Sequence, residues 1–144
     1  MARGPNPQRR FRNLGLGVVT AGFGVPTRQE VAHGGVDVAA PSGTPIHSPV
    51  NGVVTKVDEG HMQGENNFGN QVELTDLEGK RYQFNHLQNI LMKSGRVKKG
   101  QVIATVGKTG AVYSPTNSDP SNLDFRIVDS YNRYVDPTRY ISHL

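Results

Sequence analysis

The sequence of 144 residues contains no cysteine. This absence excludes a disulfide framework and a thiolate zinc site, so a bound metal ion would have to be held by His, Asp or Glu side chains. Apolar runs are short as well, and none reaches the roughly 18 residues that a membrane-spanning helix needs. We therefore expect neither a membrane span nor a cysteine-based site.

Acidic side chains are absent before Glu30, whereas four arginines stand among residues 1–14. We expect this segment to be a basic, flexible N-terminal arm that precedes a domain of residues 15–144. Such an arm can contact nucleic acid, an anionic membrane or an acidic protein surface, and it can equally be a solvated terminus. The apolar stretch of residues 14–25 holds four glycines and has no small-x-small cleavage pattern after it, so we expect no signal peptide.

Glycine (17) and proline (9) are frequent, which is typical of short strands joined by many turns. The turn at residues 77–80 is of the kind that joins two strands in a hairpin. We expect a helical turn only at residues 87–92. The predicted strands cover residues 18–20, 36–39, 52–57, 71–74, 81–84, 101–106 and 123–128. The sequence thus predicts one all-β domain of mostly antiparallel strands.

The segment His33-Gly34-Gly35-Val36-Asp37 places two potential metal ligands four residues apart. In a straight strand they would lie about 13 Å apart, at about 3.3 Å per residue, whereas the ligands of one zinc ion hold their donor atoms about 2.0–2.2 Å from it. The chain must therefore bend at the two glycines, which puts His33 in a loop and Asp37 on the strand that follows. In the alternative interpretation, the segment is a turn in which Asp37 caps backbone groups.

Two further segments carry polar side chains that could contribute to a site. His86 directly follows a predicted strand, where a histidine is more often a surface residue than a catalyst. In the last predicted strand, alternation puts Asn122, Asp124 and Arg126 on one face and two apolar residues on the other. That polar face either lines a site or simply meets water.

These segments stand in the order and spacing of the lysostaphin-like (LytM-type) peptidoglycan zinc endopeptidases, which the sequence resembles over nearly the whole predicted domain. Residues 33–41, HGGVDVAAP, resemble a block of that family that contains H-x-x-x-D. Residues 84–87 take the place of its Y-x-H-L segment, and residues 19–24, 97–103 and 135–141 resemble further blocks. The resemblance implies an all-β, duplicated hybrid-like metallopeptidase fold.

In that family, zinc is held by the His and Asp of H-x-x-x-D and by the second His of an H-x-H strand. The resemblance implies that His33 and Asp37 are metal ligands and that His86 is a catalytic histidine, which assists the attacking water. The H-x-H motif, however, is degenerate, because the family's H-L-H-F reads Asn-Leu-Asp-Phe here. Asp124 therefore takes the third ligand position, and Asn122 takes the position of the catalytic base.

Both substitutions impair the chemistry of hydrolysis. Two carboxylates and a neutral imidazole cancel the +2 charge of a metal ion, so the ion polarises its bound water less than in a site with one carboxylate. The amide of Asn122 cannot take up a proton, and general-base assistance is worth about 10²–10⁴-fold. Asp119 or Asp129 could stand in for the base. The loop of residues 113–121, longer than its counterpart in the family, is expected to border the substrate groove.

We therefore expect a non-catalytic, degenerate peptidase domain that binds peptidoglycan peptide or serves as a structural part of a larger assembly. A phage virion or tail is such an assembly, and it would deliver a wall-directed domain that has no export signal. In the first alternative, the domain is an active zinc endopeptidase with a variant His-Asp-Asp site that cleaves peptidoglycan cross-link peptides. In the second, it is a lipoyl- or biotinyl-type carrier barrel, which residues 48–54 and 97–102 suggest.

Overall fold

The computed structural model describes residues 15–27, 30–112 and 118–144, and the expected arm of residues 1–14 lies outside the described residues. The described chain forms eleven strands and one short 3₁₀ helix, η1 (Thr138–His143). Every pairing between these strands is antiparallel. The prediction of an all-β, mostly antiparallel domain is confirmed. Across the described segments, no helix has the length and apolar character needed to cross a membrane.

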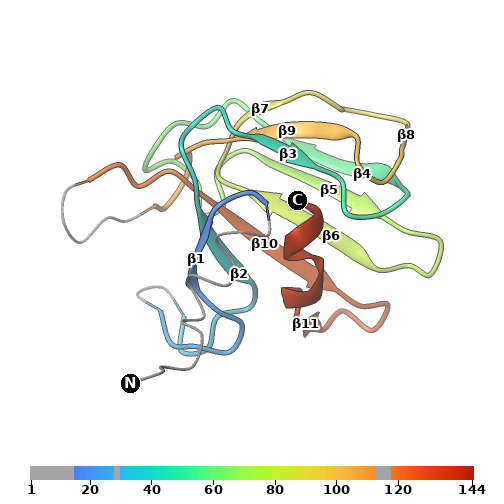
Figure 1. Ribbon diagram of the computed structural model, residues 1–144, viewed down its shortest axis with the longest axis horizontal. Coiled ribbons are helices and arrows are strands. Elements are labelled where there is room, and N and C mark those ends of the chain that lie inside the picture. The colour runs from blue at the N-terminus through green and yellow to red at the C-terminus, as the bar shows by residue number, and fades with distance from the viewer. Residues whose placement is uncertain (1–14, 28–29, 113–117) are drawn as a thin grey trace, which may run out of the picture.

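Two sheets make up the domain, and Figure 1 shows the smaller one lying over one part of the larger. The order of strands in the larger sheet is β1 (Val18–Ala21), β2 (Val36–Ala39), β10 (Asn122–Val128), β6 (Arg81–Asn85), β5 (Gln71–Thr75), β4 (Gly52–Asp58) and β8 (Arg96–Val97), and β11 (Tyr134–Val135) also pairs with β10. The order in the smaller sheet is β3 (Pro45–His47), β9 (Val102–Val106) and β7 (Leu87–Ile90).

The predicted helical turn at residues 87–92 is wrong, because residues 87–90 form strand β7. The side chains of Leu87 and Ile90 are buried in the core, and β7 pairs with β9 across a bulge that shifts the register between Leu87 and Asn89. That irregularity hides the alternation by which a strand is recognised in a sequence. Strands β3, β8 and β11 are two or three residues long, which is too short for any periodic pattern.

The larger sheet has one apolar face and one polar face. Tyr82 and Phe84 of β6 and Leu123 and Phe125 of β10 are fully buried in the core cluster, which they share with side chains of the smaller sheet. Because side chains alternate along a strand, the residues between them point to the opposite face. That opposite face carries Gln83, Asn85, Asp124 and Arg126.

The polar face is nevertheless shielded from water. Asn85, Asp124 and Arg126 keep at most 4% of their surface exposed. The interpretation in which the polar side of the last strand simply meets water is therefore wrong. Buried charges of this kind require partners, and those partners define the functional site.

Candidate metal centre and groove

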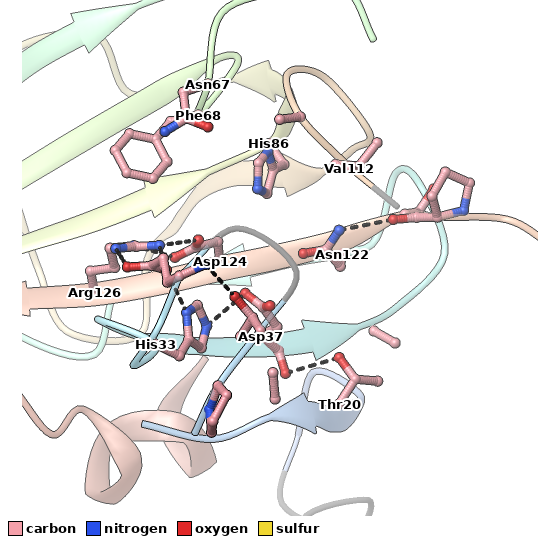
Figure 2. Close-up of a pocket in the computed structure, with 18 of the residues that line it drawn as sticks. Thr20, His33, Asp37, Asn67, Phe68, His86, Val112, Asn122, Asp124 and Arg126 are labelled. Carbon is pink, nitrogen blue, oxygen red and sulfur yellow. Dashed lines mark hydrogen bonds and ion pairs between the residues drawn. The ribbon is translucent and has the colours of Figure 1, made fainter. Parts of the chain in front are cut away.

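A groove of about 1100 Å³ runs along the polar face of the larger sheet. All five residues singled out from the sequence line it, and Figure 2 shows how they lie around it: His33, Asp37, His86, Asn122 and Asp124. Ser118, Asp119, Pro120 and Ser121 line it as well, so this part of the long loop borders the groove as predicted. Residues 113–117 of that loop lie outside the described residues.

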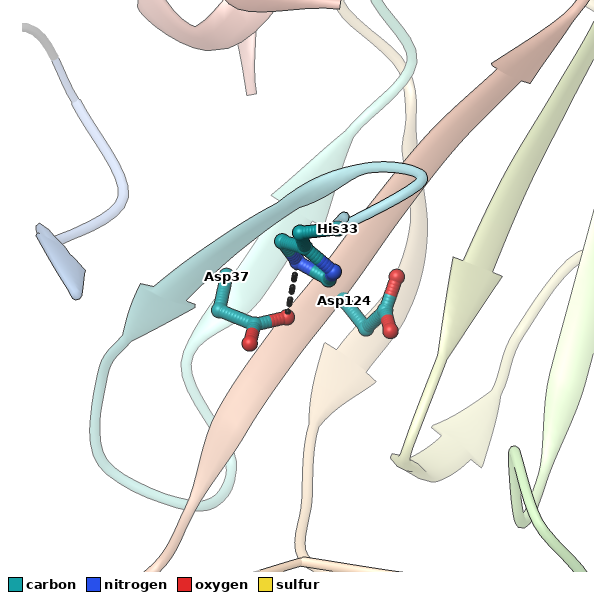
Figure 3. Close-up of side chains that lie close together, drawn as sticks. All are labelled: His33, Asp37 and Asp124. Carbon is teal, nitrogen blue, oxygen red and sulfur yellow. Dashed lines mark ion pairs between the residues drawn. The ribbon is translucent and has the colours of Figure 1, made fainter. Parts of the chain in front are cut away.

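The three predicted metal ligands come together at one end of the β2–β10 pair, as Figure 3 shows. Asp37 of β2 and Asp124 of β10 are direct cross-strand partners, so both carboxylates lie on the same face. His33 reaches them from the loop before β2. One donor atom from each residue lies within 4.8 Å of the other two. The prediction that His33 lies in a loop and Asp37 on the next strand is confirmed.

Gly34 and Gly35 are required here for space rather than for an unusual backbone conformation. Neither has a positive φ. A Cβ atom on Gly34 would lie 2.8 Å from Nη1 of Arg126, and one on Gly35 would lie 2.5 Å from both Cγ of Arg126 and the carbonyl oxygen of Phe125. The loop that carries His33 therefore packs directly on the side chain of Arg126.

Replacing Gly35 with alanine is expected to lower the free energy of unfolding by about 1–3 kcal/mol, because the new methyl group overlaps a buried backbone carbonyl. Urea denaturation would measure the loss. Gly22→Ala is the matched control, since the nearest atom to its added Cβ is 3.8 Å away. Equal stabilities for the two variants would contradict the close packing of the loop on β10.

His33 is only 3% exposed, and an acidic side chain lies next to each of its ring nitrogens. Its Nδ1 is hydrogen-bonded to Oε1 of Glu30 at 2.9 Å. Its Nε2 lies 3.0 Å from Oδ1 of Asp37, but it has no partner in hydrogen-bond geometry. A buried ring nitrogen without a hydrogen bond, aimed at a pair of carboxylates, fits a metal ligand whose other nitrogen is oriented by a carboxylate. The residues present therefore fit a divalent metal ion.

Without a metal ion, His33 is charged near neutral pH. Burial disfavours the imidazolium, but Asp37 and Glu30 outweigh it and raise the pKa of His33 from 6.5 to about 9. Arg126 and His33 likewise overcome the effect of burial on Glu30 and lower its pKa to about 2. A metal ion binds only neutral imidazole, so its binding must displace the proton of His33.

The raised pKa of His33 predicts a pH-dependent stability of the metal-free protein. A group whose pKa is raised on folding contributes stability that is complete below its unfolded pKa, here 6.5, and is lost as the pH passes its folded pKa, here about 9. Thermal unfolding in a chelator, between about pH 6 and about pH 10, should therefore show a falling midpoint across this range. His33→Gln should flatten the curve, and an unchanged slope in that variant would assign the effect to another group.

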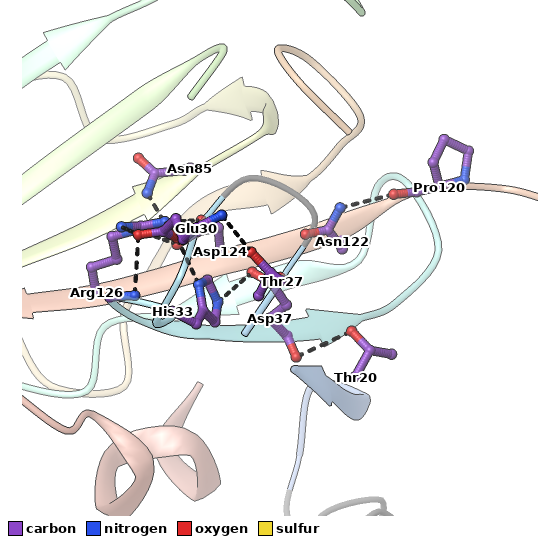
Figure 4. Close-up of polar contacts among 11 residues, drawn as sticks. Thr20, Thr27, Glu30, His33, Asp37, Asn85, Pro120, Asn122, Asp124 and Arg126 are labelled. Atoms are coloured by element: carbon purple, nitrogen blue, oxygen red, sulfur yellow. Dashed lines mark hydrogen bonds and ion pairs between the residues drawn. The ribbon is translucent and has the colours of Figure 1, made fainter. Parts of the chain in front are cut away.

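Glu30 and Arg126 complete the site, although the sequence predicted no role for either of them. Figure 4 shows the guanidinium of Arg126 between the carboxylates of Glu30 and Asp124. Glu30 accepts bonds from Arg126 Nη2 at 2.7 Å and Nη1 at 3.2 Å, and from the backbone N–H of Gly34 at 3.3 Å. One feature of the sequence could have pointed to Arg126, which stands two residues after Asp124 on the same face of the predicted strand. Nothing in the sequence pairs it with Glu30, 96 residues away.

Glu30 and Arg126 together do not change the net charge predicted for the metal ion and its three ligands. Glu30 and Arg126 carry equal and opposite charges, so a metal ion with Asp37, Asp124 and neutral His33 would still be neutralised overall. The loss of polarising power therefore stays a prediction for the folded site.

His86 lies across the groove, at the end of β6, in a left-handed conformation with φ of 66°. Its backbone N–H donates to the carbonyl of Phe68 at 2.8 Å, which holds this strained conformation. Its Nδ1 lies 2.8 Å from the carbonyl oxygen of Thr109, which can only accept, so Nδ1 carries the proton. Figure 2 shows the ring directed into the groove, so Nε2 is the acceptor that faces a ligand.

Asn122, which the resemblance places at the position of the family's base, is held by the neighbouring loop. Asn122 donates from Nδ2 to the carbonyl oxygen of Pro120 at 2.8 Å. Asp119 lines the groove, but its Oδ1 accepts bonds from the hydroxyl and the backbone N–H of Ser121, which lower its pKa. Asp129 lies at the far end of β10, where it holds the turn to β11. Asp129 is thus placed away from the groove, and the bonds from Ser121 make Asp119 a weaker base.

Comparison with known proteins agrees with this geometry. Residues 31–137 match Peptidase family M23. Over 90 residues the chain is 43% identical to the peptidoglycan DD-endopeptidase ShyC of Vibrio cholerae, a match that covers 62% of this chain and 20% of that protein. The chain thus spans about a fifth of the length of this relative.

Two solved structures share the fold. One is the catalytic domain of lysostaphin from Staphylococcus simulans, with a TM-score of 0.66 and 26% identity over 93% of this chain and 96% of that one. The other is a zinc-containing peptidase from Vibrio cholerae, with a TM-score of 0.68 and 31% identity over 83% of this chain and 35% of that one. A family match over most of the chain, together with this fold and these metal-ligand positions, shows that the chain belongs to peptidase family M23, the family of LytM and lysostaphin.

Proposed function

We propose that this domain binds the peptide part of peptidoglycan in its groove and does not hydrolyse it. One observation carries the proposal: the side chain that the resemblance places in the position of the base is the amide of Asn122, which donates to the carbonyl oxygen of Pro120. Loss of a general base alone removes about 10²–10⁴-fold of the rate. The neutralised metal site would lower the rate further.

Binding does not depend on the missing groups. The groove keeps a volume of about 1100 Å³ and an acceptor nitrogen on His86. Relatives such as ShyC are peptidoglycan endopeptidases by name, and a scaffold can keep the recognition surface of its family after it has lost the chemistry. Membership of a peptidase family also argues against the carrier-barrel alternative.

Sedimentation with purified sacculi tests the proposal. The protein should pellet with sacculi and release no soluble peptide fragments, with or without added zinc. Ala111→Trp, which puts a large side chain on the wall of the groove, should abolish co-sedimentation.

Leu77→Trp is the matched control. Leu77 is fully exposed on the β5–β6 hairpin and does not line the groove, so this variant should pellet like the unmodified protein. Equal binding by both tryptophan variants, or no binding by the unmodified protein, would contradict recognition through the groove.

An active metallopeptidase is the second candidate, and the convergence of His33, Asp37 and Asp124 favours it. These residues would hold zinc, which would supply Lewis-acid polarisation of a peptide carbonyl. His86 would then orient the substrate through its Nε2. Release of soluble fragments from sacculi, dependent on zinc and abolished by His33→Ala, would establish this candidate and overturn the first.

The location of the protein in a phage virion stays a prediction. Mass spectrometry of purified particles would test it, because a structural component is recovered in stoichiometric amounts with the other virion proteins.

A further inference from the structure

The side chain of Arg126 is a permanent cation beside the candidate metal site, bonded to its ligand Asp124. It is 4% exposed and lies on the same strand and the same face as Asp124. Its neighbours on the sheet and in the loops hold it from several directions, so the site contains a fixed positive charge whether or not a metal ion is present.

Asp124 is almost fully occupied by hydrogen bonds from protein groups. Its Oδ1 accepts from Nε of Arg126 at 2.8 Å and from Nδ2 of Asn85 at 3.4 Å, and its Oδ2 accepts from Nη2 of Arg126 at 2.9 Å. A carboxylate offers about four lone-pair positions. Three are therefore used, and a metal ion that took Asp124 as a ligand would have to share it with Arg126 or displace it.

Arg126 is also fixed on its other sides. Its guanidinium carbon lies 4.7 Å from the ring centre of Phe68 and 5.2 Å from that of Tyr134, so both rings are cation–π partners of Arg126. Glu30 accepts from its remaining edge. Gly34 and Gly35 leave the space that its side chain fills. A guanidinium that bonds two carboxylates in this way is a fixed structural part of the site.

We propose that Arg126 is a resident cation that competes with a divalent metal ion for Asp124 and so keeps the metal affinity of the site low. This inference deepens the proposed function and rests on it, because weak zinc binding is expected of a domain that binds peptidoglycan without hydrolysing it. The competition has two parts. The N–H groups of Arg126 occupy the oxygens that a metal ion needs, and its charge repels a second cation at short range.

Zinc titration of the purified, chelator-treated chain tests the proposal, with competition against a chromophoric chelator as the readout. Arg126→Gln should bind Zn²⁺ at least about tenfold more tightly than the unmodified protein, because it removes the two bonds from Arg126 to Asp124 and a repelling charge. Arg133→Gln is the matched control. Arg133 is an exposed arginine paired with Asp129 at 3.0 Å, and its loss should leave the affinity unchanged.

A second variant covers the case in which Arg126→Gln does not fold. Glu30→Gln combined with Arg126→Gln removes equal and opposite charges, so the partly exposed Glu30 is not left as an anion without its arginine partner. It should still bind Zn²⁺ more tightly than the unmodified protein, because Asp124 is released. Recovery of folded Arg126→Gln by Zn²⁺ alone would also support the proposal, since the metal ion would then replace the lost cation.

Unchanged or weaker zinc binding in the folded Arg126 variants would overturn the proposal and make Arg126 a residue that positions Asp124 for the metal ion. This outcome is separable from the test of the proposed function, because metal affinity is measured without peptidoglycan. Failure to bind sacculi would leave the zinc titration and its result unaffected.

Discussion

Replacing Asn122 and Asp124 with histidine is expected to restore zinc binding and hydrolysis only when Arg126→Gln is added. The two histidines would rebuild the H-x-H strand of the family, and the regained base is worth about 10²–10⁴-fold in rate. In the double variant, however, Arg126 would lose both of its bonds to Asp124 and lie as a cation beside an imidazole that must stay neutral to bind metal. The triple variant removes that conflict.

Zinc titration and fragment release from sacculi would measure the outcome for both variants, with Asn122→His alone as the control. That control regains the base position but keeps the Asp124–Arg126 pair, so it should gain little zinc affinity. If neither the double nor the triple variant binds zinc more tightly, β10 has been wrongly assigned as the metal-binding strand. If both are equally active, Arg126 does not impede the site.

Replacing Asp124 with asparagine is expected to destabilise the metal-free protein by about 3–5 kcal/mol. Asp124 and Arg126 are buried, with 6% and 4% of their side chains exposed, and loss of one member of such a pair leaves the other as a poorly compensated buried charge. Arg126 would keep Glu30 as a partner, but Glu30 is partly exposed at 28%. Urea denaturation in the presence of a chelator would measure the change.

Glu59→Gln provides the control for a salt bridge of similar length at the surface. Glu59 and Lys93 lie 3.0 Å apart with 46% and 58% of their side chains exposed, and such pairs contribute about 0–1 kcal/mol. A comparable small loss for Asp124→Asn would show that the buried pair contributes no more than an exposed one. The paired variant Asp124→Asn with Arg126→Gln should recover part of the stability, because it removes both charges together.

The alternation of side chains made much of the fold predictable. In β6 and β10 the apolar residues at every second position face the core, and the polar residues between them lie on the opposite face of the sheet, as the period of two requires. Strand β7 was misjudged because a bulge breaks its alternation, and β3, β8 and β11 are too short to show one. The helical turn expected in place of β7 reflects the same loss of pattern.

The candidate site was predictable where its residues are close in sequence. His33 and Asp37 are separated by two glycines and a valine, and that spacing requires a bend if both side chains are to bind one metal ion. The pairing of Asp37 with Asp124 in adjacent strands could be inferred only through resemblance to a family, because no local pattern reports a cross-strand neighbour 87 positions away. The role of Glu30 escaped prediction for the same reason.

The sequence by itself determined which chemical groups stand at positions 122 and 124. An amide at position 122 takes up no proton in any fold, and an acid at position 124 is an anion where an imidazole would be neutral. Only the tertiary structure decided how that anion is balanced. Arg126, Glu30, Phe68 and Tyr134 meet around Asp124 from different elements of the fold. Charge compensation in a buried site depends on distance in space, which a linear sequence does not contain.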